Sequence, residues 1–582
     1  MKLGALIILL GLIGFPLVLP DATYEQTVLL LAFLVAIQSI SWNIISGFAG
    51  YVSLGHSVFL GIGAYTAAIL AERWGVNPLV LAPVAGVVAV VVALLIGSVV
   101  LRAKGPAFVI ITIALLLVFQ MLAINLHGLT NGSDGITLEL PFWDADIQNI
   151  PFYYAFLGLM VLAFGFSAWI RRTKFGTGLV AIREDEGKAA AIGIPTALYK
   201  NLAYAASAFF VGAAGAVYAY FLTFLNPLGA FNILTSVTVV LGALVGGRGT
   251  LWGPVVGAFI VSFASEAATN LGSESQSRLL MFGLALVIVV LFLPQGILPA
   301  LQRLFARRSP VEYTDHVGAM AERKIEVRSR SAEAVEGPML ELHDVHKAFG
   351  GLKAVNGVDL VVPQGSITAL IGPNGSGKTT LFNLITGTGG PHTGSISFGG
   401  TRIDGMQPWQ RAHLGLGRTF QVTRLFKSMT VLENVVAPLE RFAPGVLASG
   451  AVGGHEADRA RDLLSFVGLE RFAAQQAGAL SYGQQKLVEL AQVLMLEPRM
   501  VLLDEPAGGI NPGLVGRMAE IIRAANRQGV TFLVVEHNIP MVLDLCDPII
   551  VLAAGSVIAS GPPDVVRADP AVLDAYLGEV TA

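Results

Sequence analysis

The sequence predicts two fold classes in one chain: a polytopic α-helical membrane domain of about 8–10 spans, followed by an α/β domain with a phosphate-binding P-loop. Hydrophobic residues make up 54% of the 582 residues and charged residues only 13%, against about 25% charged in an average soluble domain. Charged residues are sparse in the first half of the chain and ordinary in the second. We therefore expect a membrane domain at 1–302, a linker at 303–337 and a soluble domain at 338–582.

Long apolar stretches predict the membrane domain. A helix needs roughly 20 apolar residues to cross a bilayer, and about nine stretches meet or approach this length. The first stretch could instead be a signal peptide that begins at Lys2. It lacks a small-x-small cleavage site, so we expect a retained span. The stretches are 3–20, 28–46, 54–71, 77–101, 106–126, 151–170, 200–222, 231–270 as a pair, and 279–298.

The placement of Lys and Arg predicts the orientation of these spans, because cytoplasmic loops are enriched in both residues. With the N-terminus inside, the inside loops include the basic residues of 102–104 and 171–188. The opposite side receives 127–150, which has no Lys or Arg. We therefore expect a multi-pass protein of the plasma (inner) membrane with 338–582 in the cytoplasm.

The segment 43–63 is rich in glycine and lies within this domain. It could be a broken helix that lines a cavity, or it could allow close helix packing through small residues. Polar groups in apolar spans are costly and often functional. Asn43, His56 and Glu266 could therefore contact a bound solute, or they could satisfy neighbouring groups or helix ends.

Other features of the composition restrict the class of function. The net charge of −3 argues against nucleic acid as a partner. The single cysteine, Cys546, cannot form an internal disulfide, and we expect it to pack as a small hydrophobe. The polar, weakly periodic segment 303–337 predicts a partly disordered tether.

The longest basic loop, 171–199, contains the run REDEGKAAAIG. This run predicts a short amphipathic helix with Gly193 as its C-terminal cap. Its charges could face water, or the helix could dock onto a soluble domain and receive force from it. We favour docking, because a soluble domain follows in the same chain. The residues expected to couple the two domains are Arg183, Glu184, Asp185, Glu186 and Gly193.

A phosphate-binding loop follows the predicted strand 366–370 and opens a helix. Its glycines allow backbone N–H groups to surround phosphate oxygens, and the helix N-terminus adds positive potential. We expect Lys378 to neutralise the β- and γ-phosphates and the Thr379 hydroxyl to ligate Mg²⁺, so the cofactors are ATP and Mg²⁺. The ATP-binding residues of this loop are Gly372, Pro373, Asn374, Gly375, Ser376, Gly377, Lys378, Thr379 and Thr380.

Acidic residues end two further apolar strands. In MVLLDEP (500–506) we expect Asp504 to hold Mg²⁺ and Glu505 to orient or deprotonate the attacking water. Adjacent acids after a strand could also cap a helix, but the P-loop disfavours that alternative. In TFLVVEHN (531–538) we expect His537 to contact the γ-phosphate.

These motifs together resemble the ATP-binding cassette of ABC transporters, across nearly all of 338–582. The resemblance implies that Phe349 stacks on adenine, and that Gln421, in GRTFQ, ligates Mg²⁺ beside the contact with the membrane domain. His537 matches the switch histidine of the family.

The family's signature motif is similar to LSYGQQ at 480–485. By this resemblance, Ser481 and Gly483 bind the phosphate of a second cassette's nucleotide, although Tyr482 departs from the usual LSGGQ. Asn511 stands where many cassettes carry aspartate, which weakens any role for an aspartate between cassettes.

A finer resemblance extends to both halves of the chain. LFKSMTVLENV, DEPAGGINP and VVEHN are similar to an ATPase of the branched-chain amino acid uptake family, and TNGSDGI, AIREDEGKAAAIGI and GGRGTLWGPVVGA are similar to one of its permeases. The family normally encodes these subunits separately. The resemblance therefore implies a permease fused to the cassette that it docks.

The function implied by this resemblance is ATP-driven import of branched-chain amino acids. Urea, short amides or other small carboxylates are alternative solutes. The short inside loops disfavour an exporter, and Glu505 and His537 disfavour a nucleotide-gated channel or a regulatory ATPase. The implied partners are a second permease and a second ATP-binding subunit (or a second copy of this chain), an extracytoplasmic solute-binding protein, the lipid bilayer and a small amino-acid substrate.

Overall fold

The computed structural model describes residues 2–270, 295–305 and 337–577, apart from 142, 144–146, 148 and 391, together with a few single positions between 270 and 295. The chain divides into two compact units. The first unit contains Met1–Arg171 and Ala197–Val311, and the second contains Arg172–Thr196 and Glu312–Ala582. The predicted span 279–298 and the predicted linker 303–337 lie largely outside the described residues.

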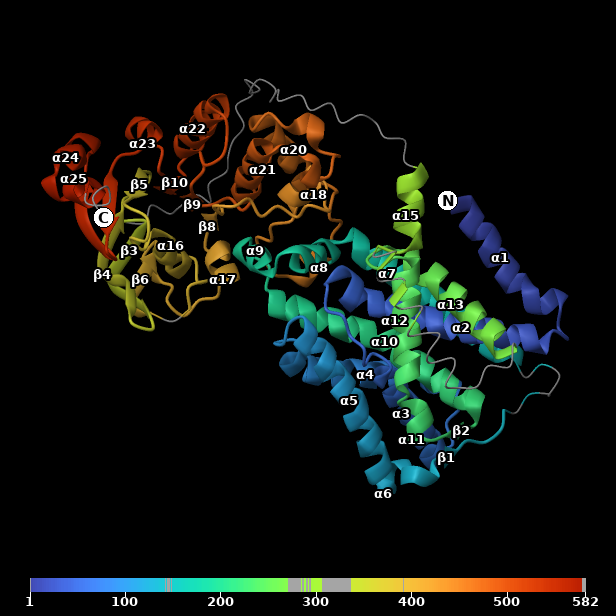
Figure 1. Ribbon diagram of the computed structural model, residues 1–582. Helices are drawn as coiled ribbons and strands as arrows, with labels where there is room; N and C mark the ends of the chain where they lie inside the picture. The colour runs from blue at the N-terminus through green and yellow to red at the C-terminus, as the bar shows by residue number, and fades with distance from the viewer. Residues whose placement is uncertain are drawn as a thin grey trace. The chain divides into compact units, whose positions relative to one another are not determined.

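The first unit consists of helices and a short antiparallel ribbon of β1 (Ile136–Thr137) and β2 (Phe224–Leu225) (Figure 1). Two short elements, a π-helix at Asn43–Phe48 and a 3-10 turn at Gly132–Asp134, accompany the α-helices. The α-helices are α1 (Lys2–Val18), α2 (Thr23–Trp42), α3 (Val58–Trp74), α4 (Pro78–Val100), α5 (Pro106–Asn125), α6 (His127–Thr130), α7 (Asn149–Arg172), α10 (Thr196–Leu222), α11 (Pro227–Ala230), α12 (Ile233–Gly246), α13 (Gly253–Asn270) and α15 (Ile297–Phe305).

Six helical segments among the described residues are long and apolar enough to cross a membrane. Shorter apolar helices at Gly4–Val18 and Gly253–Ala268 accompany them, and α3, of 17 residues, covers most of the predicted stretch 54–71. The polytopic helical domain that the sequence predicts is therefore confirmed. The six segments are Thr23–Phe48, Pro78–Val100, Pro106–Asn125, Asn149–Arg172, Thr196–Leu222 and Pro227–Gly246.

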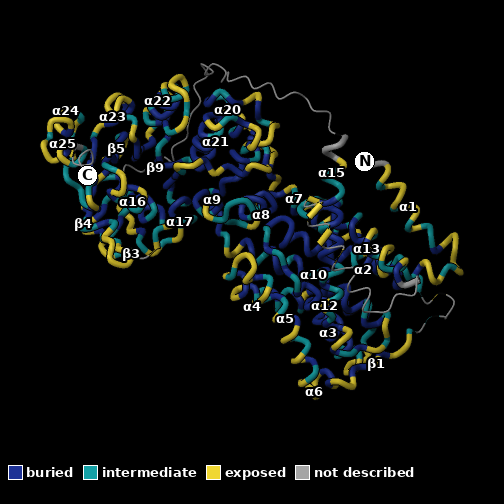
Figure 2. Tube along the Cα trace, viewed as in Figure 1, coloured by how far each residue is buried: buried dark blue, intermediate teal, exposed yellow. Residues whose placement is uncertain are grey.

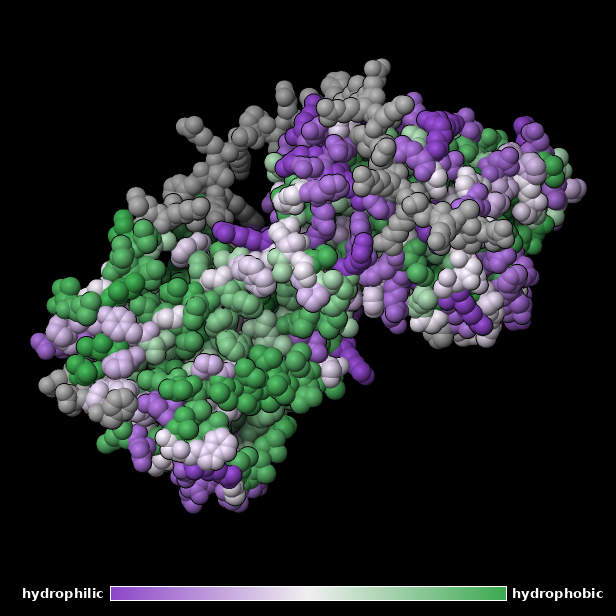
Figure 3. All heavy atoms as spheres, turned by 180° about the vertical axis from the view of Figure 1, so that it is seen from behind, coloured by the Kyte–Doolittle hydropathy of each residue, from purple (hydrophilic) through white to green (hydrophobic). Residues whose placement is uncertain are grey.

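Helix α4 has the reverse of the amphipathic pattern of a soluble helix. Ala85, Ala89 and Ala93 are fully buried, whereas Val87 and Leu95 are 54% and 68% exposed. Small residues let helix backbones approach each other, and large apolar residues facing outward suit a lipid solvent. Hydrophobic side chains accordingly gather over the N-terminal helices in Figure 3. The first unit is therefore a membrane-embedded bundle.

The glycine-rich segment 43–63 is a broken helix. Helix α2 passes into the π-helix Asn43–Phe48, and the next helix begins only at Val58. Close packing through small residues occurs as well, because a Cβ atom on Gly63 would lie 2.0 Å from the carbonyl oxygen of Gly212. The two interpretations of the sequence therefore both apply, and a solute cavity beside this segment stays a prediction.

The three polar residues expected near the solute each have a polar partner inside the first unit. These partners satisfy groups that would otherwise be costly in lipid, and a role in solute binding stays a prediction. The pairs are Asn43 Nδ2 with the Thr250 carbonyl oxygen (2.9 Å), His56 Nε2 with the Ser207 carbonyl oxygen (3.3 Å), and the Tyr24 hydroxyl with Glu266 Oε1 (2.7 Å).

The second unit contains two β-sheets. The six-stranded sheet is parallel except for its last pair, β11–β12, and the four-stranded sheet is antiparallel. In spatial order the first sheet is β12 (Ser556–Gly561), β11 (Ile549–Ala553), β5 (Ile367–Ile371), β10 (Thr531–Val535), β9 (Met500–Asp504) and β8 (Leu416–Arg418). The second is β4 (Leu352–Val362), β3 (Leu340–Phe349), β6 (Thr393–Phe398) and β7 (Thr401–Arg402).

Helices surround these sheets and also lie in the segment Arg172–Thr196, which comes from the permease-like part of the sequence. Short 3-10 turns occur at Glu470–Phe472 and Ala477–Ala479. The α-helices are α8 (Lys174–Glu184), α9 (Glu186–Ala191), α16 (Lys378–Ile385), α17 (Pro408–His413), α18 (Val431–Val436), α19 (Pro444–Ala448), α20 (His455–Phe466), α21 (Tyr482–Leu494), α22 (Pro512–Asn526), α23 (Ile539–Leu545), α24 (Pro563–Ala568) and α25 (Pro570–Leu577).

The central parallel strands are buried on both faces. Along β9, Val501 and Leu503 enter one hydrophobic core, and Met500 and Leu502 enter the other. This alternation is the period of two expected for a strand between two layers. Strands β5, β9 and β10 are dark blue along their length in Figure 2. The apolar runs at 366–370, 500–504 and 531–535 are therefore the central strands that the sequence predicts.

The only cysteine of the chain, Cys546, is a buried free thiol. Burial raises the pKa of this thiol to about 12. The thiolate is the reactive form, so we expect iodoacetamide at pH 8 to label the native protein at least ~100-fold more slowly than the denatured protein. Mass spectrometry of the Cys546 peptide measures both rates, and rapid stoichiometric labelling of native protein would contradict this burial.

Candidate functional site

The P-loop lies between β5 and the first turn of α16. Gly372, Gly375 and Gly377 have positive φ angles of 149°, 76° and 104°. Residues other than glycine rarely adopt such backbone conformations. A Cβ atom on Gly372 would also lie 2.0 Å from the carbonyl oxygen of Leu552. These glycines are therefore required by the backbone, and the loop wraps around the N-terminus of α16 as the sequence predicts.

Lys378 folds back over this loop. Its ammonium donates to the carbonyl oxygens of Gly372 at 2.7 Å and Pro373 at 2.8 Å, and the residue is only 7% exposed. A buried ammonium requires acceptors, and here the loop itself supplies them. The lysine is therefore held at the concave face of the P-loop, within reach of an anion bound there.

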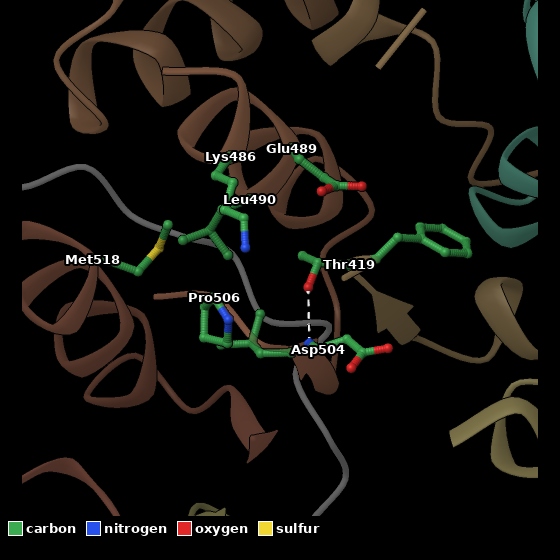
Figure 4. A pocket seen from close by; sticks show the side chains of 9 residues that line it. Thr419, Lys486, Glu489, Leu490, Asp504, Pro506 and Met518 are labelled. Atoms are coloured by element: carbon green, nitrogen blue, oxygen red, sulfur yellow. Dashed lines mark hydrogen bonds between the residues drawn. The ribbon is translucent and has the colours of Figure 1, made fainter. Parts of the chain in front are cut away.

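Asp504 ends β9 and is 2% exposed. Burial raises the pKa of its carboxyl group, while the nearby Arg418 guanidinium opposes this shift. Its backbone N–H donates to the Thr419 hydroxyl at 3.3 Å, a contact drawn in Figure 4. The strand end therefore presents a carboxylate that neighbouring polar groups hold in place.

Arg418 was not singled out by the sequence reasoning. Its guanidinium lies 3.4 Å from Asp504 Oδ2 and donates to Asn383 Oδ1 at 2.7 Å and Thr386 Oγ1 at 2.9 Å. Burial lowers the pKa of this group, and the charge of Asp504 counteracts the shift. Arg418 thus ties the end of β9 to the P-loop helix α16. Its place at the end of β8, in GRTFQ, was the available signal.

A cavity of about 370 Å³ opens beside these groups. Thr379, Gln421 and Asp504 all line it, so the three residues predicted to hold Mg²⁺ share one space. They offer hydroxyl, amide and carboxylate oxygens, which are ligands that Mg²⁺ prefers. Mg²⁺ commonly takes one or two protein carboxylates with phosphate oxygens and water. The donor set therefore fits this ion.

Glu505 contacts two other residues of the predicted site, Gln421 and His537. Gln421 Nε2 donates to Glu505 Oε1 at 3.0 Å, and His537 Nε2 lies 3.4 Å from the same oxygen. The backbone of Glu505 has φ +49°, a conformation that costs a residue other than glycine about 1–3 kcal/mol. Its N–H donates to the Val535 carbonyl oxygen at 2.9 Å, which helps to hold this conformation.

Glu536 connects the ends of β9 and β10. It is 4% exposed; its Oε1 accepts from the Ala507 N–H at 2.5 Å, and its Oε2 accepts from the His537 N–H at 2.9 Å. Because it binds both segments, this carboxylate positions His537 relative to the residues after Glu505. Glu536 is the acidic residue that ends the apolar run in TFLVVEHN, and the sequence pattern alone gives it no role.

The signature residues lie at the start of α21. Ser481 caps this helix and accepts from the Gln484 N–H at 3.4 Å. A Cβ atom on Gly483 would lie 2.5 Å from a Leu514 side-chain carbon. The Tyr482 hydroxyl donates to the Gln421 carbonyl oxygen at 3.2 Å. Tyr482, the residue that differs from LSGGQ, therefore contacts the segment around Gln421 in the same cassette.

Phe349 lies at the end of β3 and is 55% exposed. The Lys347 ammonium lies 5.2 Å from the centre of its ring. An exposed aromatic face is available for stacking, and its predicted contact with adenine stays a prediction.

The segment Arg172–Thr196, called the docking segment from here on, packs with the cassette in one compact unit. The sequence predicts one short helix in the run 183–193. This prediction is confirmed for α9 (Glu186–Ala191) and wrong for 183–185, where α8 ends. Asp185 is extended, with φ −155° and ψ 103°, and separates α8 from α9. Its side chain accepts from the Lys188 N–H at 2.9 Å and caps α9, which explains the break.

The predicted coupling acids contact the cassette directly. Glu184 accepts from the Ser428 N–H at 3.1 Å, and Asp185 Oδ2 lies 3.4 Å from the Arg424 guanidinium. Arg183 donates to the Ser428 hydroxyl at 3.2 Å. Three of the five predicted coupling residues therefore lie against the segment that follows Gln421.

Gly193 ends the docking helices with φ +90°, as its predicted capping role requires. Its carbonyl oxygen lies 2.8 Å from His413 Nε2, and the neighbouring Ile192 carbonyl accepts from the Leu439 N–H at 3.0 Å. A Cβ atom on Gly193 would lie 2.3 Å from the Leu439 carbonyl oxygen. Gly193 therefore allows both the turn that ends α9 and the close approach of this segment to Leu439.

A second contact, which the sequence did not predict, lies at the start of the docking segment. Thr173 and Gly450 form an antiparallel bridge, with the Lys174 N–H donating to Ser449 at 3.0 Å and the Ala451 N–H donating to Arg172 at 2.8 Å. These bonds use main-chain groups, which no side-chain pattern reveals. The Lys174 ammonium also pairs with Glu456.

Comparison with known families gives matches in both halves. Residues 26–291 match the family described as branched-chain amino acid transport system / permease component. Residues 355–508 match the ABC transporter family, and residues 556–582 match the family described as branched-chain amino acid ATP-binding cassette transporter.

Individual relatives match the cassette. The high-affinity branched-chain amino acid transport ATP-binding protein BraF of Pseudomonas aeruginosa is 40% identical over 251 residues, which are 42% of this chain and 98% of the relative. LivG of Escherichia coli K12, a protein of the same description, is 38% identical with the same coverage. A crystal structure of the ADP conformation of an ABC-transporter cassette is 35% identical, with a TM-score of 0.38, and the match covers 41% of this chain and 99% of that one.

The geometry around Glu505 predicts the effect of replacing its carboxylate with an amide. Glu505→Gln keeps the shape of the side chain but removes the proton acceptor, so we expect ATP binding to be retained and hydrolysis to fall ~10²–10³-fold. Nucleotide titration and phosphate release measure these two properties. Glu520→Gln, on an exposed position of α22, is the matched control. Normal hydrolysis by Glu505→Gln would assign water activation to another residue.

Proposed function

Because this chain belongs to the branched-chain amino acid family of ABC transporters, we propose that it is an importer component that carries permease and ATPase in one polypeptide. ATP hydrolysis in the cassette drives branched-chain amino acids across the inner membrane. The cassette lies in the cytoplasm, on the side that the basic loops indicate.

One observation carries the proposal of a coupled chain. The docking segment stands between α7 and α10, which are both long enough to cross a membrane, and yet it packs with the cassette. Its acids bind Arg424 and Ser428, in the segment that follows Gln421, and Gln421 binds Glu505. A short chain of contacts therefore joins the residue proposed to activate water to the loop between two membrane helices.

The P-loop holds the phosphates of ATP in this proposal. Its N–H groups and the N-terminus of α16 attract the anion. Lys378 exchanges the carbonyl oxygens of Gly372 and Pro373 for phosphate oxygens, a small movement because these acceptors belong to the cradle itself. Phe349 stacks on the adenine from the end of β3.

Thr379, Gln421 and Asp504 hold Mg²⁺ in the cavity that they share. When bound, the ion neutralises phosphate charge in the transition state. Arg418 keeps the Asp504 carboxylate aimed at this cavity from the side of β8.

Glu505 receives the proton of the attacking water in the proposed reaction. Gln421 and His537 both approach its Oε1, so they leave Oε2 as the acceptor for that proton. Glu536 fixes the backbone of His537, from which the imidazole reaches the γ-phosphate.

Ser481 and Gly483 serve the nucleotide of a partner cassette, as the resemblance to the family implies. A working assembly therefore contains a second ATP-binding subunit and a second permease, or a second copy of this chain. An extracytoplasmic binding protein delivers the solute. Branched-chain amino acids are the proposed solutes because BraF and LivG are described by that substrate.

Transport measurements test this function. Vesicles containing this chain and the subunits encoded beside it, with the neighbouring binding protein outside, are expected to accumulate labelled leucine, isoleucine and valine when ATP is inside. The binding protein should raise ATP hydrolysis several-fold, because solute delivery is coupled to cassette closure.

Lys378→Met serves as the control, since loss of the cradle lysine should abolish both uptake and hydrolysis. Accumulation of labelled urea or acetamide in place of leucine would show that the solutes are urea or short amides rather than branched-chain amino acids. Efflux from preloaded vesicles, or hydrolysis that ignores the binding protein, would contradict import.

The docking contacts predict an uncoupled variant. Glu184→Lys with Asp185→Lys places positive charge against Ser428 and Arg424, so we expect ATP affinity to persist while transport per ATP falls at least ~5-fold. The ratio of accumulated solute to released phosphate in vesicles measures the coupling.

Asp458→Lys with Glu470→Lys changes the net charge equally at exposed positions of the cassette and is the matched control. An unchanged ratio in the docking variant would place the coupling contact elsewhere.

A further inference from the structure

A buried ion pair joins the docking segment to the cassette. Lys188 Nζ lies 2.6 Å from Glu489 Oε1, and the two side chains are 0% and 2% exposed. Lys188 belongs to α9 and Glu489 to α21, the helix that Ser481 caps. Neither residue is among the described residues that line the P-loop cavity, although Glu489 lines a smaller pocket that also includes Asp504. The proposed hydrolysis gives this pair no role.

The surroundings of the two charges differ. Within the described residues, Glu489 is the sole carboxylate within 4.0 Å of the Lys188 ammonium, which otherwise lies 5.1 Å from the centre of the Phe420 ring. Lys188 is likewise the sole cation within 4.0 Å of Glu489 in the described part of the chain, but the Glu489 charge also acts on Arg418 and Lys486 from farther away. Figure 4 shows Glu489 and Lys486 on the same helix. Losing Glu489 therefore strands a buried cation, whereas losing Lys188 leaves the carboxylate with other cations nearby.

This asymmetry distinguishes the pair from the ionic contact between Asp185 and Arg424 in the docking segment. Asp185 and Arg424 are 30% and 49% exposed, so water can solvate either charge when its partner is missing. Water cannot solvate a fully buried ammonium. An interface that buries this group without its counterion is therefore destabilised by the free energy of desolvating the charge. Specificity between similar partners commonly arises from such a penalty against the wrong one.

We infer that Lys188 makes the docking segment selective for its cassette. The segment accepts a cassette that carries a carboxylate at the position of Glu489, eight residues after the signature serine, and rejects one that lacks it. In an assembly with a second, different cassette, this pair assigns the docking segment of this chain to its own ATPase. The inference rests on the proposed function, in which this segment transmits force.

Three variants of the full-length chain test the inference. Glu489→Gln imitates a cassette without the carboxylate and is expected to uncouple transport at least ~5-fold and to speed hydrogen exchange in 186–194 by ~10-fold. Lys188→Met alone should change both by less than about twofold, because Glu489 retains nearby cations. Lys188→Met with Glu489→Gln should return both readouts to the level of Lys188→Met, since the stranded cation is gone.

Asp458→Asn, which removes a carboxylate 74% exposed, is the control and should change neither readout. Unchanged nucleotide affinity in each variant shows that the cassette is folded. Normal docking in Glu489→Gln, or failure of Lys188→Met to rescue it, would overturn the inference. Hydrogen exchange requires no transported solute, so a parent chain that fails to import leucine would refute the proposed function without affecting this test.

Discussion

Parallel pairing of three buried strands is the constraint on which the nucleotide site depends. Val535 of β10 aligns with Leu370 of β5 and with Asp504 of β9. Because the strands are parallel and in this register, the next residues of all three emerge at one edge of the sheet. The P-loop, Glu505 and His537 therefore meet there although the sequence separates them widely. Any shift of one strand by a residue would turn its side chains to the opposite core.

The strained backbone at Glu505 follows from the same pairing. The chain must leave β9 and place a carboxylate beside His537, and a positive φ achieves this turn. The Val535 carbonyl and the buried Lys486 ammonium, which binds the Glu505 carbonyl, hold the turn. Desolvation lowers the pKa of Lys486, and the surrounding carboxylates counteract this shift. The strain at Glu505 is thus balanced by bonds that the folded sheet supplies.

The strand ends were predictable from the sequence, and so was docking through Arg183, Glu184 and Asp185, whereas the break between α8 and α9 and the cassette partners of the docking segment were not. Short apolar runs followed by DE, by EH and by a glycine loop have one consistent arrangement in a parallel sheet. Asp185 could have been recognised as a helix cap, since aspartate is favoured at that position, but its place inside a strongly helical run concealed it. No local pattern indicates that Lys188 is buried, because its partner Glu489 is 301 residues away. Arg418 was similarly hidden, because burial of a charge depends on tertiary partners rather than on local pattern.

In the membrane half, small side chains are buried and large aliphatic side chains are exposed, which is the reverse of a soluble domain. This difference explains why the charged docking segment folds with the cassette. In α4 the alanines face inward and the large aliphatic side chains face outward, an arrangement that only lipid tolerates. Residues 172–196 instead carry Lys174, Arg183, Glu184, Asp185 and Lys188, charges that a lipid-exposed surface cannot accommodate. The cassette offers each of them a partner of opposite charge or a polar group. A fully buried ammonium that loses its counterion cannot be solvated by water, so the interior Lys188–Glu489 contact contributes more discrimination than the exposed contacts around it. The docking segment is therefore a part of the permease-like sequence that folds against the cassette.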